Sequence, residues 1–500
     1  MLKRKLPSPI TILMGVIVLA AICTWLIPAG KYDTLSYAKK TGFAINHEKG
    51  DVAVPFTQAT LDSLHIKSSP EKIANSPINK PISIPGSYHQ LPSSHKGFLD
   101  VVEAPIKGII DAAEIVVFLL VIGGFMHVFN ETGAMERGLK ALSYRMKGKE
   151  AWLIVILTFL FSFAGASYGM AEEALVFYAV LVPIFIAAGY DLLLPVAVIF
   201  GGTQLGTLAS FTNPFSTIIA SNAAGVNWTD GFGERIIMFL VTTAITIWYL
   251  VRYALKIKKD PTASIVYKTD GKVHSIYPEM AASTHAPGPL GIKTTLLLLL
   301  FLFSFLTLIT GVVWFDWGMT EMTALFIGAS VLIAIVLRVK ENIFISQFIK
   351  GAESLLGVSL IVGVARGVKL VLTEGNISDS IVYYAAQAVS TLPASLFIVM
   401  MLLLFIFFTL FISSSSGMAV LTMPIMGSLA MLVNVPGREI VNAYLFGMGI
   451  MGFITPTGLI LPSLALVNVS IKAWWKFIWP LLLMLTLVCI ACLLIGIRLH

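Results

Sequence analysis

Long apolar runs, separated by short polar segments, make up most of the chain. Many of these runs are longer than the roughly 18 apolar residues that indicate a membrane-spanning helix. Backbone groups inside a bilayer have no water to bond to, so helices are the expected way of pairing them. The pattern therefore predicts an all-α polytopic membrane protein with the lipid bilayer as its surroundings.

The order of the runs predicts six parts of the chain. They are a first transmembrane span at 1–28, a polar extracytoplasmic insertion at 29–97, a first transport repeat at 98–256, a cytoplasmic linker at 257–291, a linking span with the first span of the second half at 292–338, and a second transport repeat at 339–500. The insertion is rich in Pro, Ser, Lys and His, and this composition fits either a small cap or a disordered segment.

Two apolar runs of the first repeat are short for a complete crossing. The runs 151–164 and 174–188 lie below the roughly 20 residues that a spanning helix needs. We therefore expect a re-entrant hairpin at 151–189. The next helix, 192–221, is expected to break at Thr212-Asn213-Pro214, because Pro lacks a backbone donor and disfavours helix at the residue before it.

The second repeat follows the same plan, with a hairpin at 393–433 and a helix at 438–468 that breaks at Thr455-Pro456. Gly169-Met170 at the first tip matches Gly417-Met418 at the second. The extra span between the halves reverses the direction of the second repeat. This arrangement predicts an inverted-topology repeat, which is typical of secondary transporters. The alternative is a chance likeness of spacing among apolar helices.

Charge adds an orientation to this picture. The chain is 57% hydrophobic and only 12% charged, and its net charge of +7 lies in short clusters between the apolar runs. Such clusters are typical of cytoplasmic loops rather than of nucleic-acid binding. We expect a bacterial inner (cytoplasmic) membrane protein with a cytoplasmic N-terminus, an external C-terminus and a basic amphipathic helix at 134–150. The sequence has no phosphate-binding loop and no hydrolase motif, so no enzyme activity is expected.

Charged residues inside apolar runs are the first candidates for a binding site, because a charge in hydrocarbon is costly. Glu172 and Glu173 follow the first tip directly and are expected to bind a substrate ammonium group or a proton; alternatively, one of them caps the next helix. Arg366 is expected to hold a substrate carboxylate, because its guanidinium can donate two parallel hydrogen bonds. The alternative is an ion pair with Glu353 or Glu114. The other charged candidates are Asp111, His127 and Lys369.

Polar residues at the tips and breaks form the second group of candidates. They are Ser167, Thr212, Asn213, Ser414, Ser415, Thr455 and Thr457. Oxygen ligands of this kind suit a hard cation, so a sodium site is expected near Ser167, Asn213, Ser415 and Thr455. The alternative is close packing of small residues between helices. No residue is expected to be catalytic, and no cofactor is expected besides a coupling ion, either sodium or a proton.

Five motifs together resemble those of the anaerobic four-carbon dicarboxylate carrier (DcuC) family, in its YfcC-like branch of basic amino-acid antiporters. The motifs are Pro28–Tyr32, Tyr168–Glu173, Thr212–Gly225, Gly363–Gly367 and Thr455–Gly458. This family is placed in the ion transporter superfamily, so the resemblance implies a scaffold, a transport domain, a homodimer and an elevator motion. It also implies substrate and cation contacts at Ser167, Glu172, Thr212, Asn213, Ser415, Thr455 and Thr457.

The leading hypothesis is a secondary active transporter or antiporter of small charged metabolites, most of all cationic amino acids of the arginine/ornithine type. The branch resemblance and the Glu172-Glu173 pair favour this substrate class. A four-carbon dicarboxylate carrier, with Arg366 and Lys369 as anchors, is the alternative. A channel or a membrane receptor is the alternative from a different class.

Overall fold

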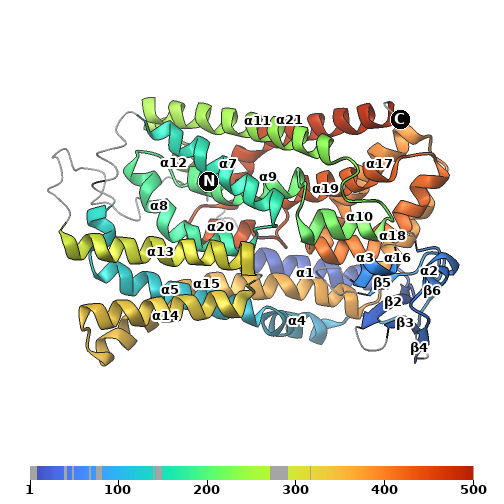
Figure 1. The fold of residues 1–500 in the computed structure, drawn as a ribbon, viewed down its shortest axis with the longest axis horizontal. Coiled ribbons are helices and arrows are strands. Elements are labelled where there is room, and N and C mark those ends of the chain that lie inside the picture. Colours follow the sequence, from blue (N-terminus) through green and yellow to red (C-terminus); the bar gives the residue numbers. More distant parts are fainter. Residues whose placement is uncertain are drawn as a thin grey trace, which may run out of the picture.

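The computed structural model describes residues 8–38, 42–47, 50–66, 69–74, 81–138, 141, 149–270, 291–315 and 317–498. Most of the basic segment expected at 134–150 and most of the linker expected at 257–291 therefore lie outside the described residues. The helices run largely along the long axis of the molecule, and the strands gather at one end of it (Figure 1). Eight of the described helices are apolar and long enough to cross a membrane.

The polar insertion after the first helix folds into two small β-sheets, which the sequence did not predict. It follows helix α1 (Pro9–Leu26). A four-stranded antiparallel sheet has the order β4-β3-β2-β5, and β1 pairs with β6. The bounds are β1 Gly30–Lys31, β2 Thr34–Ala38, β3 Gly42–His47, β4 Gly50–Val54, α2 Gln58–Ser63, α3 Pro70–Ala74, β5 Ile82–Ser83 and β6 His89–Gln90. Leu35, Phe43 and Leu61 are buried in its own small core, so this segment is a folded cap.

The first helical part is interrupted after Ser167 and again after Leu208, close to the predicted tip and at the predicted break. Its elements are α4 Phe98–Asp111, α5 Ala113–Glu131, α7 Glu150–Ser167, the 3-10 helix η1 Glu172–Phe177, α8 Tyr178–Ala187, α9 Leu193–Leu208, the π-helical turn η2 Pro214–Ile218, α10 Ile219–Ala223, α11 Phe232–Lys259, η3 Pro261–Ala263 and α12 Ile265–Asp270. The chain is not helical between Leu208 and Pro214, where the break was expected. Helix α7 is longer than the predicted arm, because it continues to Ser167.

The second helical part begins after the linker and extends to the end of the described residues. It consists of α13 Ile292–Phe315, α14 Met319–Leu337, α15 Glu341–Glu374, α16 Ser378–Val389, α17 Ala394–Phe411, α18 Ser415–Leu432, α19 Gly437–Gly452, α20 Ile460–Leu466 and α21 Ile471–Arg498. The interval between α19 and α20 contains Thr455-Pro456. The directions in which the two parts cross the bilayer, and the re-entry of the hairpins, stay predictions.

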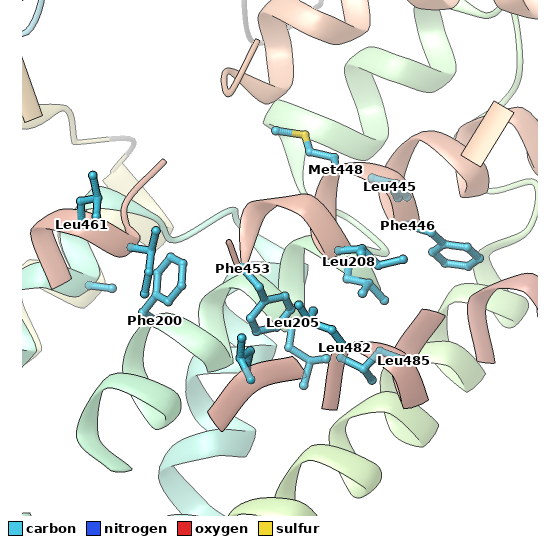
Figure 2. Packing of buried hydrophobic residues seen from close by; sticks show 14 of the residues in the cluster. Phe200, Leu205, Leu208, Leu445, Phe446, Met448, Phe453, Leu461, Leu482 and Leu485 are labelled. Atoms are coloured by element: carbon cyan, nitrogen blue, oxygen red, sulfur yellow. The ribbon is translucent and has the colours of Figure 1, made fainter. Parts of the chain in front are cut away.

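Side chains of α9, α19, α20 and α21 interdigitate in the main core (Figure 2). Phe200 and Leu208 of α9 lie beside Phe453, Leu445 and Leu482, which all have almost no exposed surface. This core surrounds the two places where the helices break. The indole Nε1 of Trp474 donates a hydrogen bond of 2.9 Å to the carbonyl oxygen of Phe453, which satisfies one backbone group freed by the second break.

Candidate functional site

A cavity of about 400 Å³ lies where the two helix tips and the two breaks meet. Its wall takes residues from η1, α9, η2, α15, α17, α18, α19 and α20 and from non-helical intervals next to them. The lining residues are Gly169, Ala171, Glu172, Glu173, Gln204, Thr207, Asn213, Phe215, Val362, Ala365, Arg366, Thr409, Ser413, Ser414, Ser415, Ser416, Met448, Gly452, Thr455, Thr457, Gly458, Leu459 and Pro462. Segments more than 200 residues apart in the sequence therefore form one site.

Eight of the ten residues expected at the site line this cavity: Glu172, Glu173, Asn213, Arg366, Ser414, Ser415, Thr455 and Thr457. Ser167 and Thr212 do not line it. The hydroxyl of Ser167 donates to the carbonyl oxygen of Phe163 at 2.7 Å, and Thr212 Oγ1 donates to the carbonyl oxygen of Ser167 at 2.9 Å. Both hydroxyls thus stabilise the end of α7 instead of facing the cavity.

The first tip depends on Gly169. Helix α7 ends with the backbone N–H groups of Tyr168, Gly169 and Met170 all directed at the carbonyl oxygen of Ala164, at 3.1–3.3 Å. Gly169 has φ +85°, a conformation that costs glycine little because it has no Cβ. A Cβ added at this position would also lie 2.7 Å from Asn213 Oδ1, so the tip fits against the break only with glycine here.

Asn213 connects the first tip to the first break. Its Nδ2 donates to the carbonyl oxygen of Gly165 at 3.0 Å, and its Oδ1 accepts from the backbone N–H groups of Phe215 and Ser216 at 2.8 and 3.2 Å. The side chain is almost completely buried. Both lone pairs of the amide oxygen are therefore used by the protein, and Asn213 caps the helical segment that starts at Pro214.

The second tip and the second break are joined in a comparable way. The hydroxyls of Thr455 and Thr457 are 2.8 Å apart, and Thr457 Oγ1 donates to the carbonyl oxygen of Leu410 near the end of α17 at 3.3 Å. Ser414 caps α18, since its Oγ accepts from the backbone N–H of Gly417 at 3.3 Å. The N-terminus of α18 consequently lies at the cavity, where its partial positive charge favours an anionic group.

Three charged residues line the cavity, and two of them form an ion pair, so one carboxylate has no cationic partner among the described residues. Arg366 Nη2 lies 3.4 Å from Glu172 Oε1, so the alternative pairing with Glu353 or Glu114 is wrong. Glu173 Oε2 accepts a hydrogen bond of 2.9 Å from the backbone N–H of Ala171. Within the described part of the chain, no cation pairs with Glu173. The remaining charged candidates, Asp111, Glu114, His127, Glu353 and Lys369, do not line the cavity.

Comparison with known proteins identifies the chain. The model of a family described as C4-dicarboxylate anaerobic carrier (DcuC) matches residues 6–498. The chain belongs to this carrier family. It is 38% identical over 478 residues to an uncharacterized protein of Haemophilus influenzae, covering 95% of this chain and 94% of the relative. It is 28% identical over 494 residues to the "Putative basic amino acid antiporter YfcC" of Escherichia coli K12, covering 95% and 93%.

Two solved transporter structures are similar to this carrier at low identity. MtrF of Neisseria gonorrhoeae, described among antimetabolite efflux pumps, has a TM-score of 0.40 and 15% identity, with 98% of this chain and 95% of MtrF covered. The YdaH transporter of Alcanivorax borkumensis has a TM-score of 0.38 and 16% identity, with 99% of each chain covered.

The sequence reading of this carrier missed Gln204 and Thr207, which reach the cavity from α9. A Cβ at Gly452 would collide with the amide of Gln204, so glycine at that position makes room for this side chain. The available signal was Gln204 itself, the one amide side chain between Leu192 and Leu208 of the 192–221 segment. A polar group at such a position usually faces a cavity or a partner helix.

Proposed function

We propose that this carrier is a secondary active transporter that exchanges cationic amino acids of the arginine/ornithine type across the bacterial inner membrane. The observation that carries the proposal is the surplus carboxylate. Of the residues lining the cavity, only Glu172, Glu173 and Arg366 are ionisable, so two carboxylates face one guanidinium. Like charges that are removed from water repel strongly, and a bound cation relieves that repulsion.

The charge of the filled cavity separates the two main substrate classes. Arginine carries one net positive charge at neutral pH, and it would neutralise the single surplus negative charge. A four-carbon dicarboxylate would add two negative charges to a cavity that already has a surplus of one. The substrate guanidinium or side-chain ammonium would lie against Glu173, and the α-carboxylate would lie between Arg366 and the start of α18.

Three further observations support this function. The E. coli relative is named for basic amino acid exchange. The cavity volume of about 400 Å³ falls within the range of roughly 300–1,000 Å³ that is usual for small-molecule sites. Hydroxyls of Ser413–Ser416 surround the N-terminus of α18, and they could bind a carboxylate together with its backbone N–H groups.

The four-carbon dicarboxylate alternative has one observation in its favour besides the family description. Arg366 and the N-terminus of α18 both reach the cavity, and both attract anions. Succinate or malate could bind there if Glu172 and Glu173 were protonated. A channel, by contrast, would conduct without counterflow, and a receptor would bind a ligand without flux.

Counterflow in proteoliposomes tests the proposal. Vesicles loaded with unlabelled ornithine should accumulate labelled arginine, whereas vesicles loaded with succinate should not. Glu173→Gln should lose arginine uptake at least about tenfold and should gain uptake of citrulline, a neutral amino acid of similar shape. Succinate–succinate exchange without arginine exchange would overturn the proposal. Separate sodium and pH gradients would show which ion, if either, drives uptake.

A further inference from the structure

The ion pair between Glu172 and Arg366 joins two parts of the structure across the cavity. Glu172 begins η1 after the first tip, whereas Arg366 lies in α15, a helix that packs against α1, α4 and α5. The two side chains are 26% and 33% exposed, so the open space of the cavity reaches both of them. The pair is therefore a tie between α15 and the first tip, and it is within reach of a bound solute.

Each member of the pair has the other as its only ionic partner in the part of the chain that the structure describes. The distance of 3.4 Å between Nη2 and Oε1 is longer than the roughly 2.7–2.9 Å of a strong charge-assisted hydrogen bond. Among the described residues, no protein acceptor uses the other donors of the guanidinium. A better-matched carboxylate could thus compete with Glu172 for Arg366.

An α-amino acid carries both groups that such a competition needs. Its carboxylate can accept two hydrogen bonds from Arg366, and its ammonium can donate to the carboxylate of Glu172. The substrate head group would replace one ion pair by two. Glu173 is less suited to this role, because its Oε2 already accepts from the backbone of the tip, and it remains for the substrate side chain.

We propose that the Glu172–Arg366 ion pair, called the lock from here on, restrains the empty carrier, and that only an α-amino-acid head group breaks this pair. The inference rests on the proposed function and deepens it. A carrier must open its cavity to each side in turn, and elements on opposite walls of the cavity must then move relative to one another. Without a bound solute, the pair ties α15 to the tip, so the empty carrier would change slowly between opening to one side and opening to the other. Exchange would then be much faster than net transport.

Efflux of labelled arginine from proteoliposomes tests the lock. With the unaltered protein, external ornithine should accelerate efflux at least about tenfold over efflux into plain buffer. External agmatine, which is arginine without its carboxylate, should give no acceleration because it cannot engage Arg366. Acceleration by agmatine equal to that by ornithine would overturn the head-group requirement without any variant.

Glu172→Gln keeps the size of the side chain and removes the ion pair. It should raise efflux into plain buffer at least about fivefold and bring the ratio of exchange to net efflux towards one. Glu341→Gln, at an exposed position in the first turn of α15, should leave the ratio unchanged. Arginine flux with the same ratio in Glu172→Gln overturns the lock alone. Absence of any arginine flux from the unaltered protein overturns the proposed function, and the lock with it.

Discussion

Replacing Gly206 by alanine tests whether close packing of α7 and α9 builds the cavity. Gly206 lies between Gln204 and Thr207, which both line the cavity. A Cβ on Gly206 would come closest to the carbonyl oxygen of Ser162 and would lie 2.6 Å from the backbone nitrogen of Ala166, both in α7, whereas ordinary contacts start at 3.4 Å. The backbone of α7 cannot rotate away, so the two helices must separate by at least about 0.8 Å.

Overpacking of this kind costs about 1–3 kcal/mol. Alanine returns up to about 1 kcal/mol through its better helix propensity, so we expect a net loss of about 1–2 kcal/mol in stability. Because Gln204 and Thr207 move with α9, we also expect a substantial loss of transport. A misplacement of 1 Å in groups that position a substrate can lower a rate about a hundredfold.

The measurement is thermal unfolding of the purified protein in detergent, together with arginine counterflow. Gly328→Ala in α14 is the matched control, because a Cβ there meets open space. That control should unfold at the same temperature as the unaltered protein or slightly above it. The packing argument fails if Gly206→Ala is as stable as Gly328→Ala and transports equally well.

Three further predictions concern residues outside this helix pair. Asn213→Ala should lower stability by about 0.5–2 kcal/mol, since it loses the cap and the hydrogen bond to Gly165; a melting temperature equal to that of the unaltered protein would contradict it. Arg235→Ala should cost about 3–5 kcal/mol, because the guanidinium is completely buried with three acceptors, whereas exposed Arg252→Ala, which loses only a cation–π contact with Trp248, should cost at most about 1 kcal/mol in the same assay. Burial raises the pKa of Asp379 in the folded state, so the unaltered protein should gain stability relative to Asp379→Asn as the pH falls from 8 towards about 4; unfolding curves that stay parallel over this range would refute the effect.

The meeting of the tips and breaks followed from sequence because each has a strong local signature. Pro214 and Pro456 cannot continue a helix, and glycines mark the tips, so the places where backbone groups are freed were visible in the chain. The sequence did not show in which direction the hydroxyl groups at the tips and breaks point. Ser167 lies at a helix end, where a serine readily bonds the carbonyl four residues before it, and this local bond took priority over the cavity.

The partner of Arg366 could not be predicted, because it depends on a contact 194 residues away in the chain. Glu353 and Glu114 were the alternatives named from the sequence, but η1 places Glu172 next to Arg366. The sheets of the cap were missed for another reason. Their strands have only two to six residues, and such short alternating patterns are difficult to distinguish from polar loops.

The cap is attached to the helices at a few well-defined points. The ring of Tyr88 stacks on that of Tyr383 at 3.9 Å, and the backbone N–H of Tyr32 donates to Asp379 in α16 at 2.8 Å. Strand β5 also contacts α18, the helix whose N-terminus lies at the cavity. A shift of α18 would therefore also move the cap, which lies outside the cavity. A dye on the exposed strand β4 would give an optical record of single transport cycles while every residue of the cavity stays unaltered.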